Sequence, residues 1–198
     1  MCLDKRSQEI TIDQEFADLG WCLHKFWVGS GGTITYNCEN NLDKSQRWNF
    51  ATAFRQIIQQ AKDENVKRLF FLEDDAKLTP KFNEVYPYII SEIRHVDFDM
   101  LYFGGKFDDP QCTYSEQLTG HIFHKNYILD LHAVLIDNRC FDKLLDIPPH
   151  DHQSFDGFIA GRHRINIRAL ITSPIIIAQK NGWSYSAGRY LDFFKDYL

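Results

Sequence analysis

The sequence predicts an α/β fold in which helices flank a mostly parallel, Rossmann-like sheet, with a more irregular C-terminal part. Apolar strands alternate with amphipathic helices through the first half of the chain. The strand 66–72 is too apolar to have a solvated face, which is typical of parallel sheets that helices cover on both sides. The length of 198 residues fits one domain spanning 1–198, with a first half at 1–105 and a second at 106–198.

The elements of the first half follow from hydrophobic periodicity. A short strand is expected to end near residue 3, followed by a helix over 7–20 and a strand over 25–28. The clearest helix covers 48–64, where one stripe with a 3.6-residue period contains Phe50, Phe54, Ile57, Ile58 and Ala61. Thr79 as N-cap and Pro80 as the first helical residue predict the start of the next helix.

The elements of the second half are shorter. A strand at 99–103 ends at Gly104 and Gly105, and a polar, turn-rich stretch follows. Two strands are expected at 121–123 and 132–136, and a short helix at 141–145. Ser154 is expected to cap a helix that runs through 159. One or two strands within 168–177 and an irregular tail over 181–198 complete the chain.

Composition excludes several classes of function. The net charge of −5 and the lack of a basic block argue against tight nonspecific binding to DNA or RNA. A local group could still contact phosphate: Arg162, His163, Arg164 and Arg168. The five cysteines are scattered, which favours reduced thiols over disulfides. No apolar run reaches the ~18 residues of a membrane helix and the first residues lack a signal-peptide pattern, so we expect a cytoplasmic protein.

Three successive carboxylates, Glu73, Asp74 and Asp75, follow the apolar strand 66–72. Ligands of open parallel sheets bind beyond the carboxyl ends of the strands, so this turn is a candidate site. The carboxylates repel one another, and a divalent cation would remove that cost. Their hard oxygen ligands suit Mg²⁺ or Mn²⁺, and a diphosphate can complete the coordination. A solvated acidic turn without a ligand is the alternative interpretation.

These residues carry a resemblance to a known family. The Leu-Glu-Asp-Asp sequence that ends at Asp75 resembles the DxD-type motif of GT-A glycosyltransferases, and especially that of family 25, the lipooligosaccharide-type galactosyltransferases. Further similar segments follow in the order of the family along most of the chain. They are residues 3–6, 26–29, 50–61, 133–136 with 141–145, 155–158, and 174–179 with Ser184 and Ser186.

The resemblance implies an inverting, metal-dependent hexosyltransferase of the GT-A fold that moves a sugar from a nucleotide sugar, in particular a UDP-sugar, to an acceptor hydroxyl. Asp75 and Glu73 would bind Mn²⁺ or Mg²⁺. The nucleotide sugar would contact Leu3, Asp4, Arg6, Glu73 and Asp74. Asp156 would be the general base that deprotonates the acceptor. Its alternative role is that of a carboxylate that offsets the dipole at a helix start.

Other residues are candidates for the same site. Gly104 and Gly105 could let a donor or acceptor sugar approach the backbone, although a tight turn explains them equally well. His152, in the loop 150–152, or His163 could supply a third metal ligand. The acceptor could be a glycan, a lipooligosaccharide, a protein hydroxyl or a modified nucleobase, stacked on Trp183, Tyr185 and Tyr190.

Two other functions fit the same acidic strand end. The first is a metal-dependent nucleotidyltransferase or phosphohydrolase, which also needs carboxylates around a divalent cation. The second is a carbohydrate-binding protein that has the fold but no catalytic activity. Asp156 and the segment 174–186 separate the three, because only the transferase uses them.

Overall fold

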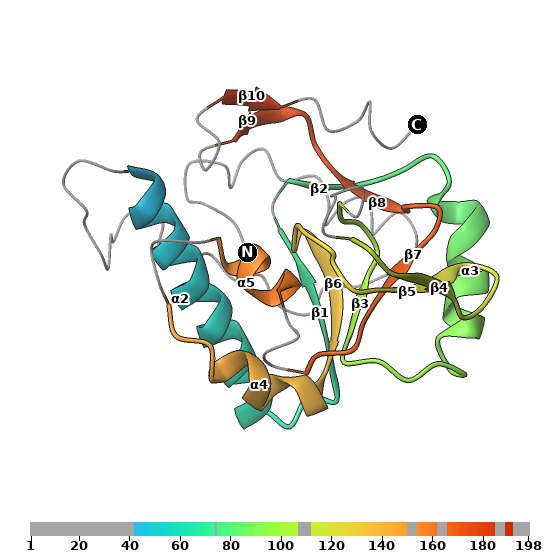
Figure 1. Ribbon diagram of the computed structural model, residues 1–198, viewed down its shortest axis with the longest axis horizontal. Coiled ribbons are helices and arrows are strands. Elements are labelled where there is room, and N and C mark those ends of the chain that lie inside the picture. Colours follow the sequence, from blue (N-terminus) through green and yellow to red (C-terminus); the bar gives the residue numbers. More distant parts are fainter. Residues whose placement is uncertain are drawn as a thin grey trace.

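The structure, a computed structural model, describes residues 42–73, 75–106, 112–149, 154–161, 166–184 and 189–191 (Figure 1). Its helices are α2 (Leu42–Asp63), α3 (Phe82–Glu92), α4 (Phe141–Leu145) and α5 (Phe155–Ala160), with a 3₁₀ turn η2 (Asn138–Cys140) before α4. Its strands are β1 (Arg68–Leu72), β2 (Ala76–Leu78), β3 (Met100–Tyr102), β4 (Ser115–Gln117), β5 (Ile122–Lys125), β6 (Ala133–Asp137), β7 (Ala169–Thr172), β8 (Ile177–Gln179), β9 (Gly182–Ser184) and β10 (Arg189–Leu191).

Six strands form the central sheet in the order β1-β6-β3-β7-β5-β4. Strands β1, β3 and β7 run in one direction, and β6 lies antiparallel between β1 and β3. Of the neighbouring pairs in this described sheet, only β3 with β7 is parallel. The expected mostly parallel sheet is therefore not what the described residues form. One reason is that β6, from the second half of the chain, is inserted antiparallel between two strands of the first half. The other is that β5 pairs antiparallel with both β7 and β4.

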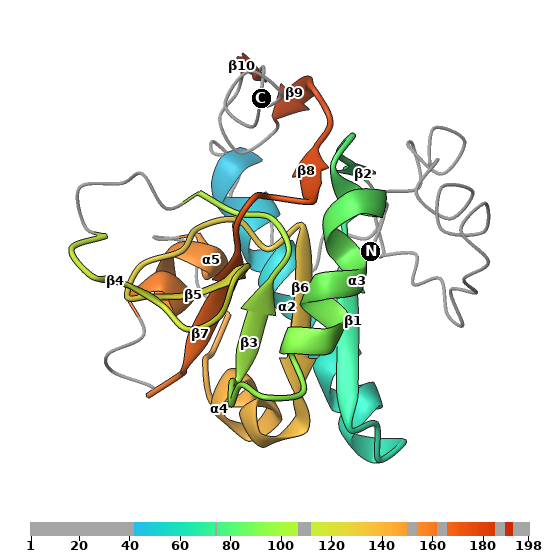
Figure 2. The same ribbon diagram turned by 90° about the vertical axis from the view of Figure 1, so that its right-hand side faces the viewer.

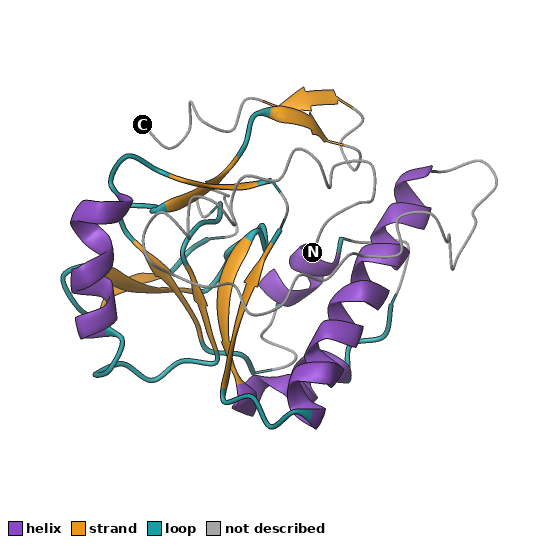
Figure 3. Cartoon of the chain, turned by 180° about the vertical axis from the view of Figure 1, so that it is seen from behind, coloured by secondary structure: helices purple, strands orange, loops and turns teal. Residues whose placement is uncertain are grey.

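The two faces of the sheet bury separate apolar clusters. Met100 and Tyr102 point to one face, and Leu101 and Phe103 point to the other, following the two-residue period of a strand. Helices α2, α4 and α5 cover the first face, and α3 covers the second (Figure 3). This arrangement confirms the predicted α/β class with helices on both faces. In β1 only Phe71 is fully buried, because β1 is an edge strand of the described sheet.

Helices on the first face lie close to their predicted positions. The helix predicted over 48–64 is α2, which already begins at Leu42. Its Phe54 is fully buried, with its ring centroid 5.0 Å from that of Phe71 and 5.2 Å from that of Phe155. The predicted cap of α5 is confirmed, since Ser154 Oγ accepts a hydrogen bond from the backbone N of Gly157 at 3.3 Å. The short helix α4 also spans the predicted residues.

Helix α3 begins later than predicted. Its N-cap is Lys81 and its first residue is Phe82, so Thr79 and Pro80 precede the helix. Thr79 is tied to the chain leading into β8 instead: its N donates to Ile176 O at 3.0 Å and its Oγ1 to Ile175 O at 3.2 Å. The Thr79 side chain is thus held by the chain before β8 and does not cap the helix, and the sequence around Thr79 does not reveal that partner.

The C-terminal part contains more regular structure than expected. Strands β9 and β10 pair antiparallel within the tail predicted to be irregular, and Figure 2 shows them above the sheet. Tyr190 on β10 is exposed. Strand β4 is a second addition, since it lies in a stretch expected to be turns.

The elements predicted over 1–40 lie outside the described residues, as does Tyr185. No helix in the described ranges is long and apolar enough to cross a membrane.

Candidate active site at the acidic edge of the sheet

The acidic turn lies between β1 and β2, at the edge of the sheet where β1, β3 and β7 end (upper edge of the sheet in Figure 1). Its backbone is held from two sides. Glu73 N donates to His132 O at 2.9 Å, which extends the ladder between β1 and β6 by one residue. Lys180 N, just after β8, donates to Asp75 O at 2.7 Å. Glu73 and Asp75 are thus tied to the sheet edge, and Asp74 between them lies outside the described residues.

A further carboxylate, Asp130, reaches the same edge and was not foreseen. The register of β1 with β6 ends with Leu72 paired with Ala133, and Asp130 lies three residues before Ala133, close enough for its charge to act on Glu73. The backbone of Asp130 has a φ of 66°, a left-handed conformation that aspartate adopts more readily than most residues. One signal could have revealed it, since an antiparallel strand begins at the edge where its neighbour ends. Using that signal requires knowing that β6 is the neighbour of β1.

Asp156 is anchored to this group through Asp130. Its Oδ2 accepts a hydrogen bond from Asp130 N at 3.1 Å. Asp156 lies in the first turn of α5, whose position is fixed by the Ser154 cap and by Phe155, which is buried against α2. The structure therefore brings together three residues that the sequence analysis selected, Glu73, Asp75 and Asp156, and adds Asp130.

The pKa of Glu73 is shifted by burial and by the neighbouring carboxylates. Burial, followed by the negative charges of Asp75, Asp130 and Asp156, raises the pKa of Glu73 well above its usual range. Glu73, Asp75, Asp130 and Asp156 are half-buried as residues, although Asp75 Oδ1 and Asp130 Oδ2 are themselves buried. Like charges in a partly buried site disfavour ionisation, and a bound cation would relieve that repulsion. The edge is therefore a half-buried group of acidic side chains.

His132 lies next to the acidic turn, since its backbone O accepts the hydrogen bond from Glu73 N. It is fully buried, and its Nε2 donates to Ile177 O at 3.1 Å. Within the described residues its Nδ1 has no hydrogen-bond partner. Burial, opposed in part by that hydrogen bond, lowers the pKa of His132 to about 4. The imidazole is therefore neutral at physiological pH and adds no positive charge to the carboxylate group.

Gly104 and Gly105 are required by close packing at this edge. A Cβ on Gly104 would lie 1.8 Å from Ile177 O and 2.3 Å from His132 Nε2. A Cβ on Gly105 would lie 2.8 Å from Leu129 O, in the loop that leads to Asp130. These approaches account for both glycines without a ligand. A sugar contact with their backbone stays a prediction.

The predicted metal ligands are only partly described. Among the described residues no three carboxylate, histidine or cysteine side chains are arranged to hold a metal ion. Other predicted site residues lie outside those ranges: Leu3, Asp4, Arg6, Asp74, His152 and His163. The chemistry of Glu73 and Asp75 does fit a hard divalent cation, since both supply carboxylate oxygens and since burial and the charge of Asp75 both raise the pKa of Glu73.

A hollow of about 440 Å³ lies away from the acidic turn, lined by Tyr114, Glu116, His124, Asn166, Ile167 and Arg168. It is formed by β4, β5 and the residues before β7, at the opposite end of β7 from the carboxylates. Of the four interacting carboxylates at the acidic edge, none lines this hollow. We therefore assign the candidate active site to the acidic edge, and the hollow is a separate feature.

Comparisons with known proteins place little constraint on the function. The chain matches no protein-family model, and a comparison with curated proteins also finds no match. Among solved structures, the crystal structure of A197 from STIV is similar over 72% of this chain and 74% of that one. The sequence identity is 12% and the TM-score 0.39, a level of similarity that supports no argument about function.

Proposed function

We propose that this chain is a metal-dependent, inverting glycosyltransferase of the GT-A type, which moves a hexose from a UDP-sugar to an acceptor hydroxyl. The observation that carries the proposal is the convergence of Glu73, Asp75, Asp130 and Asp156 at one sheet edge, together with the raised pKa of Glu73. Carboxylates that repel one another at an accessible site are characteristic of sites that bind a cation and its anionic substrate.

The direction of three strands supports a ligand site at the acidic edge. Strands β1, β3 and β7 run the same way and end at the acidic edge, while β6 runs against them and brings Asp130 to it. Open α/β sheets bind ligands at the carboxyl ends of strands, so a nucleotide placed there lies beside Glu73 and Asp75. In this proposal those two side chains hold Mn²⁺ or Mg²⁺, which when bound offsets the charge on the departing diphosphate.

Asp156 is proposed as the general base. Its Oδ2 is engaged by Asp130 N, whereas its Oδ1 makes no hydrogen bond to any residue that the structure describes. One oxygen therefore fixes the orientation of the carboxylate, and the other remains to accept a proton from an acceptor hydroxyl. A general base must be held within hydrogen-bond reach of the proton that it removes, and the capped start of α5 provides that placement.

The test is a product analysis of a panel of nucleotide sugars incubated with the protein and Mn²⁺, without an acceptor. Slow hydrolysis by a transferase yields UDP and free sugar, because the bond that breaks joins the anomeric carbon to the phosphate oxygen. A phosphohydrolase that uses the same carboxylates would yield UMP and sugar 1-phosphate instead. Binding of UDP without any turnover would favour the non-catalytic interpretation.

Two further conditions make the test specific. Turnover should require Mn²⁺ or Mg²⁺ and stop when EDTA is added. With an acceptor present, Asp156→Asn should lose transfer while it still binds UDP in the presence of Mn²⁺ and melts like the wild type. Normal transfer by a folded Asp156→Asn protein would contradict its role as the base, and UMP as the nucleotide product would contradict the transferase.

A further inference from the structure

The hollow between β4, β5 and the start of β7 is lined by groups that the proposed reaction does not use. It measures about 440 Å³, within the range of about 300–1,000 Å³ found for small-molecule sites. Its polar lining combines a phenol, a carboxylate, an imidazole, an amide and a guanidinium, contributed by Tyr114, Glu116, His124, Asn166 and Arg168. Hydrogen bonds to other residues hold Tyr114, Asn166 and Arg168 in place, and the groups that they leave available determine what the hollow can bind.

Tyr114 contributes an aromatic ring to the lining of the hollow. The residue is 45% exposed, but its position is fixed. Its backbone N donates to Asn126 Oδ1 at 2.9 Å and its hydroxyl donates to Glu116 Oε2 at 2.6 Å. The ring of His124 meets it edge-on at 5.4 Å between centroids. An exposed ring that is already oriented can bind an apolar ligand face with little loss of side-chain entropy.

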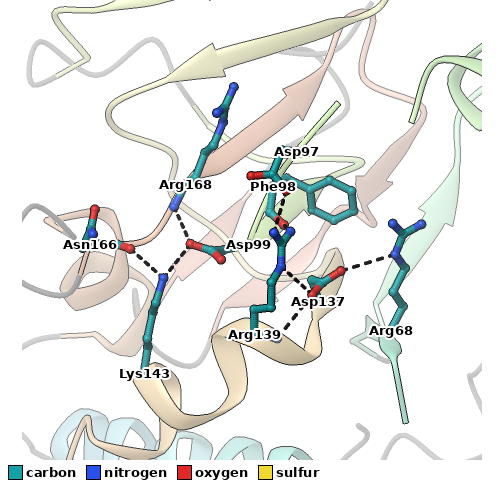
Figure 4. Close-up of polar contacts among 9 residues, drawn as sticks. All are labelled: Arg68, Asp97, Phe98, Asp99, Asp137, Arg139, Lys143, Asn166 and Arg168. Atoms are coloured by element: carbon teal, nitrogen blue, oxygen red, sulfur yellow. Dashed lines mark hydrogen bonds and ion pairs between the residues drawn. The ribbon is translucent and has the colours of Figure 1, made fainter. Parts of the chain in front are cut away.

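Arg168 adds a positively charged group to the lining of the hollow. Its backbone is held by Asp99, which accepts from Arg168 N at 2.9 Å and donates its own N to Arg168 O at 2.9 Å. Figure 4 shows the side chain running away from this network. Among the residues that the structure describes, the guanidinium makes no hydrogen bond or ion pair. A guanidinium offers several donors in one plane, which suits recognition of neighbouring oxygen atoms.

Asn166 is held beside Arg168 in an unusual backbone conformation. Its φ of 49° is left-handed, and its carbonyl oxygen accepts a hydrogen bond from Lys143 Nζ at 2.8 Å (Figure 4). This bond uses the backbone and leaves the side-chain amide, which makes no hydrogen bond inside the described ranges. The amide supplies both donors and an acceptor next to the donors of Arg168.

We propose that this hollow binds an uncharged pyranose ring of a glycan, separately from the acidic edge. The apolar face of a pyranose packs on an aromatic ring, here that of Tyr114, and its hydroxyls both donate and accept hydrogen bonds. Glu116 can accept, Arg168 can donate and Asn166 can do both. The charges of Glu116 and Arg168 are opposite, so this pair does not favour an anion such as phosphate.

The test is an NMR titration of the wild-type protein, without nucleotide, with a panel of uncharged methyl pyranosides of glucose, galactose, mannose and N-acetylglucosamine. At least one is expected to bind. Tyr114→Ala is expected to weaken its binding about tenfold or more, because the stacking surface is lost. Arg168→Gln should weaken it as well, and this variant removes no internal contact of the guanidinium that the described residues make. Tyr88→Ala is the matched control, since Tyr88 is also exposed but lies on α3, and it should bind normally.

Four results would overturn the proposal. They are an absence of binding by every pyranoside, unchanged binding by folded Tyr114→Ala and Arg168→Gln proteins, displacement of the sugar by inorganic phosphate, and loss of sugar binding in Asp75→Asn. The last would place the sugar at the acidic edge instead. Failure of the transferase proposal is a different outcome, because a protein without turnover can still bind a sugar in this hollow.

Discussion

At the end of the sheet where β1, β3 and β7 begin, acidic side chains are paired with basic ones (Figure 4). At the other end, the negative charges of Asp75, Asp130 and Asp156 act on Glu73. Lys143 Nζ donates to Asp99 Oδ2 at 2.9 Å. Arg139 connects two more aspartates, with Nε 2.9 Å from Asp137 Oδ1 and Nη1 2.6 Å from Asp97 Oδ1. These residues join the starts of β3 and β7 to the end of β6, which stabilises that edge of the sheet.

The pKa shifts at the two ends have opposite signs. A hydrogen bond from Arg139 lowers the pKa of Asp97, while burial and neighbouring carboxylates raise that of Glu73. A paired carboxylate favours the folded state at neutral pH, and a crowded one opposes it. Proteins retain unfavourable charge arrangements mainly where function requires them. The difference between the ends therefore indicates which edge is structural and which is the candidate active site.

The largest expected effect is on activity, from Asp75→Asn at the acidic edge. Even the residues that only orient metal ligands cost about 10–100-fold when mutated, so removal of a ligand charge should lower metal-dependent turnover at least about a hundredfold. Thermal stability should hold or increase, because a repelling charge is removed. Turnover is measured as release of UDP with Mn²⁺, and stability by thermal unfolding in EDTA.

Asp99 provides the matched variant at the paired edge. Asp99→Asn should turn over donor like the wild type, since Asp99 lies at the far end of β3 from the acidic turn. If both variants lost activity equally, or if Asp75→Asn kept full activity, the division between a structural edge and a reactive edge would be wrong.

The next effect is the pH dependence that His132 gives to stability. Burial lowers the pKa of His132 to about 4, against 6.5 for an exposed histidine. As the pH falls through this interval the unfolded chain takes up a proton that the folded chain does not, so stability decreases towards low pH. The loss should approach roughly 3 kcal/mol near the lower limit. It is measured by urea unfolding at several pH values.

His132→Gln is the comparison for that measurement, because an amide can still donate to Ile177 O but does not titrate. The difference between the two stability profiles should grow as the pH decreases below 6.5. Parallel profiles would mean that folding leaves the pKa of His132 unchanged, so that the folded protein takes up a proton as readily as the unfolded chain. Below that pKa the acidic edge would contain a cation, and its contrast with the opposite edge would be weaker.

Local sequence patterns predicted the parts of the site that depend on neighbouring residues in the chain. The stripe that contains Phe54 predicted α2, and Ser154 predicted the start of α5, because periodicity and capping act over a few residues. The acidic turn could be placed at a strand end for the same reason. These features are enough to place Glu73 and Asp75 at the end of a strand and Asp156 at the start of a helix without any tertiary contact.

Features that depend on strand pairing could not be predicted in this way. Asp130 joins the site only through the register of β6 on β1, and Thr79 fails to cap α3 only because it bonds the chain before β8. The mixed direction of the sheet has the same origin, since no local pattern reveals that β6 inserts between β1 and β3. The pairing of Asp99 with Lys143 also joins residues far apart in the chain.

The smallest expected effect comes from truncating the paired edge with Asp99→Ala. Asp99 is mostly buried and accepts hydrogen bonds from Lys143 Nζ and from Arg168 N, both at 2.9 Å. Its loss leaves the partly buried Arg168 N–H without this acceptor, so the free energy of unfolding should decrease by about 2 kcal/mol. Asp97→Ala is the control, because its exposed pair with Arg139 should contribute little. Equal losses of unfolding free energy would mean that neither burial nor the hydrogen bond to the sheet backbone makes Asp99 more important than Asp97. The paired edge would then act as one network.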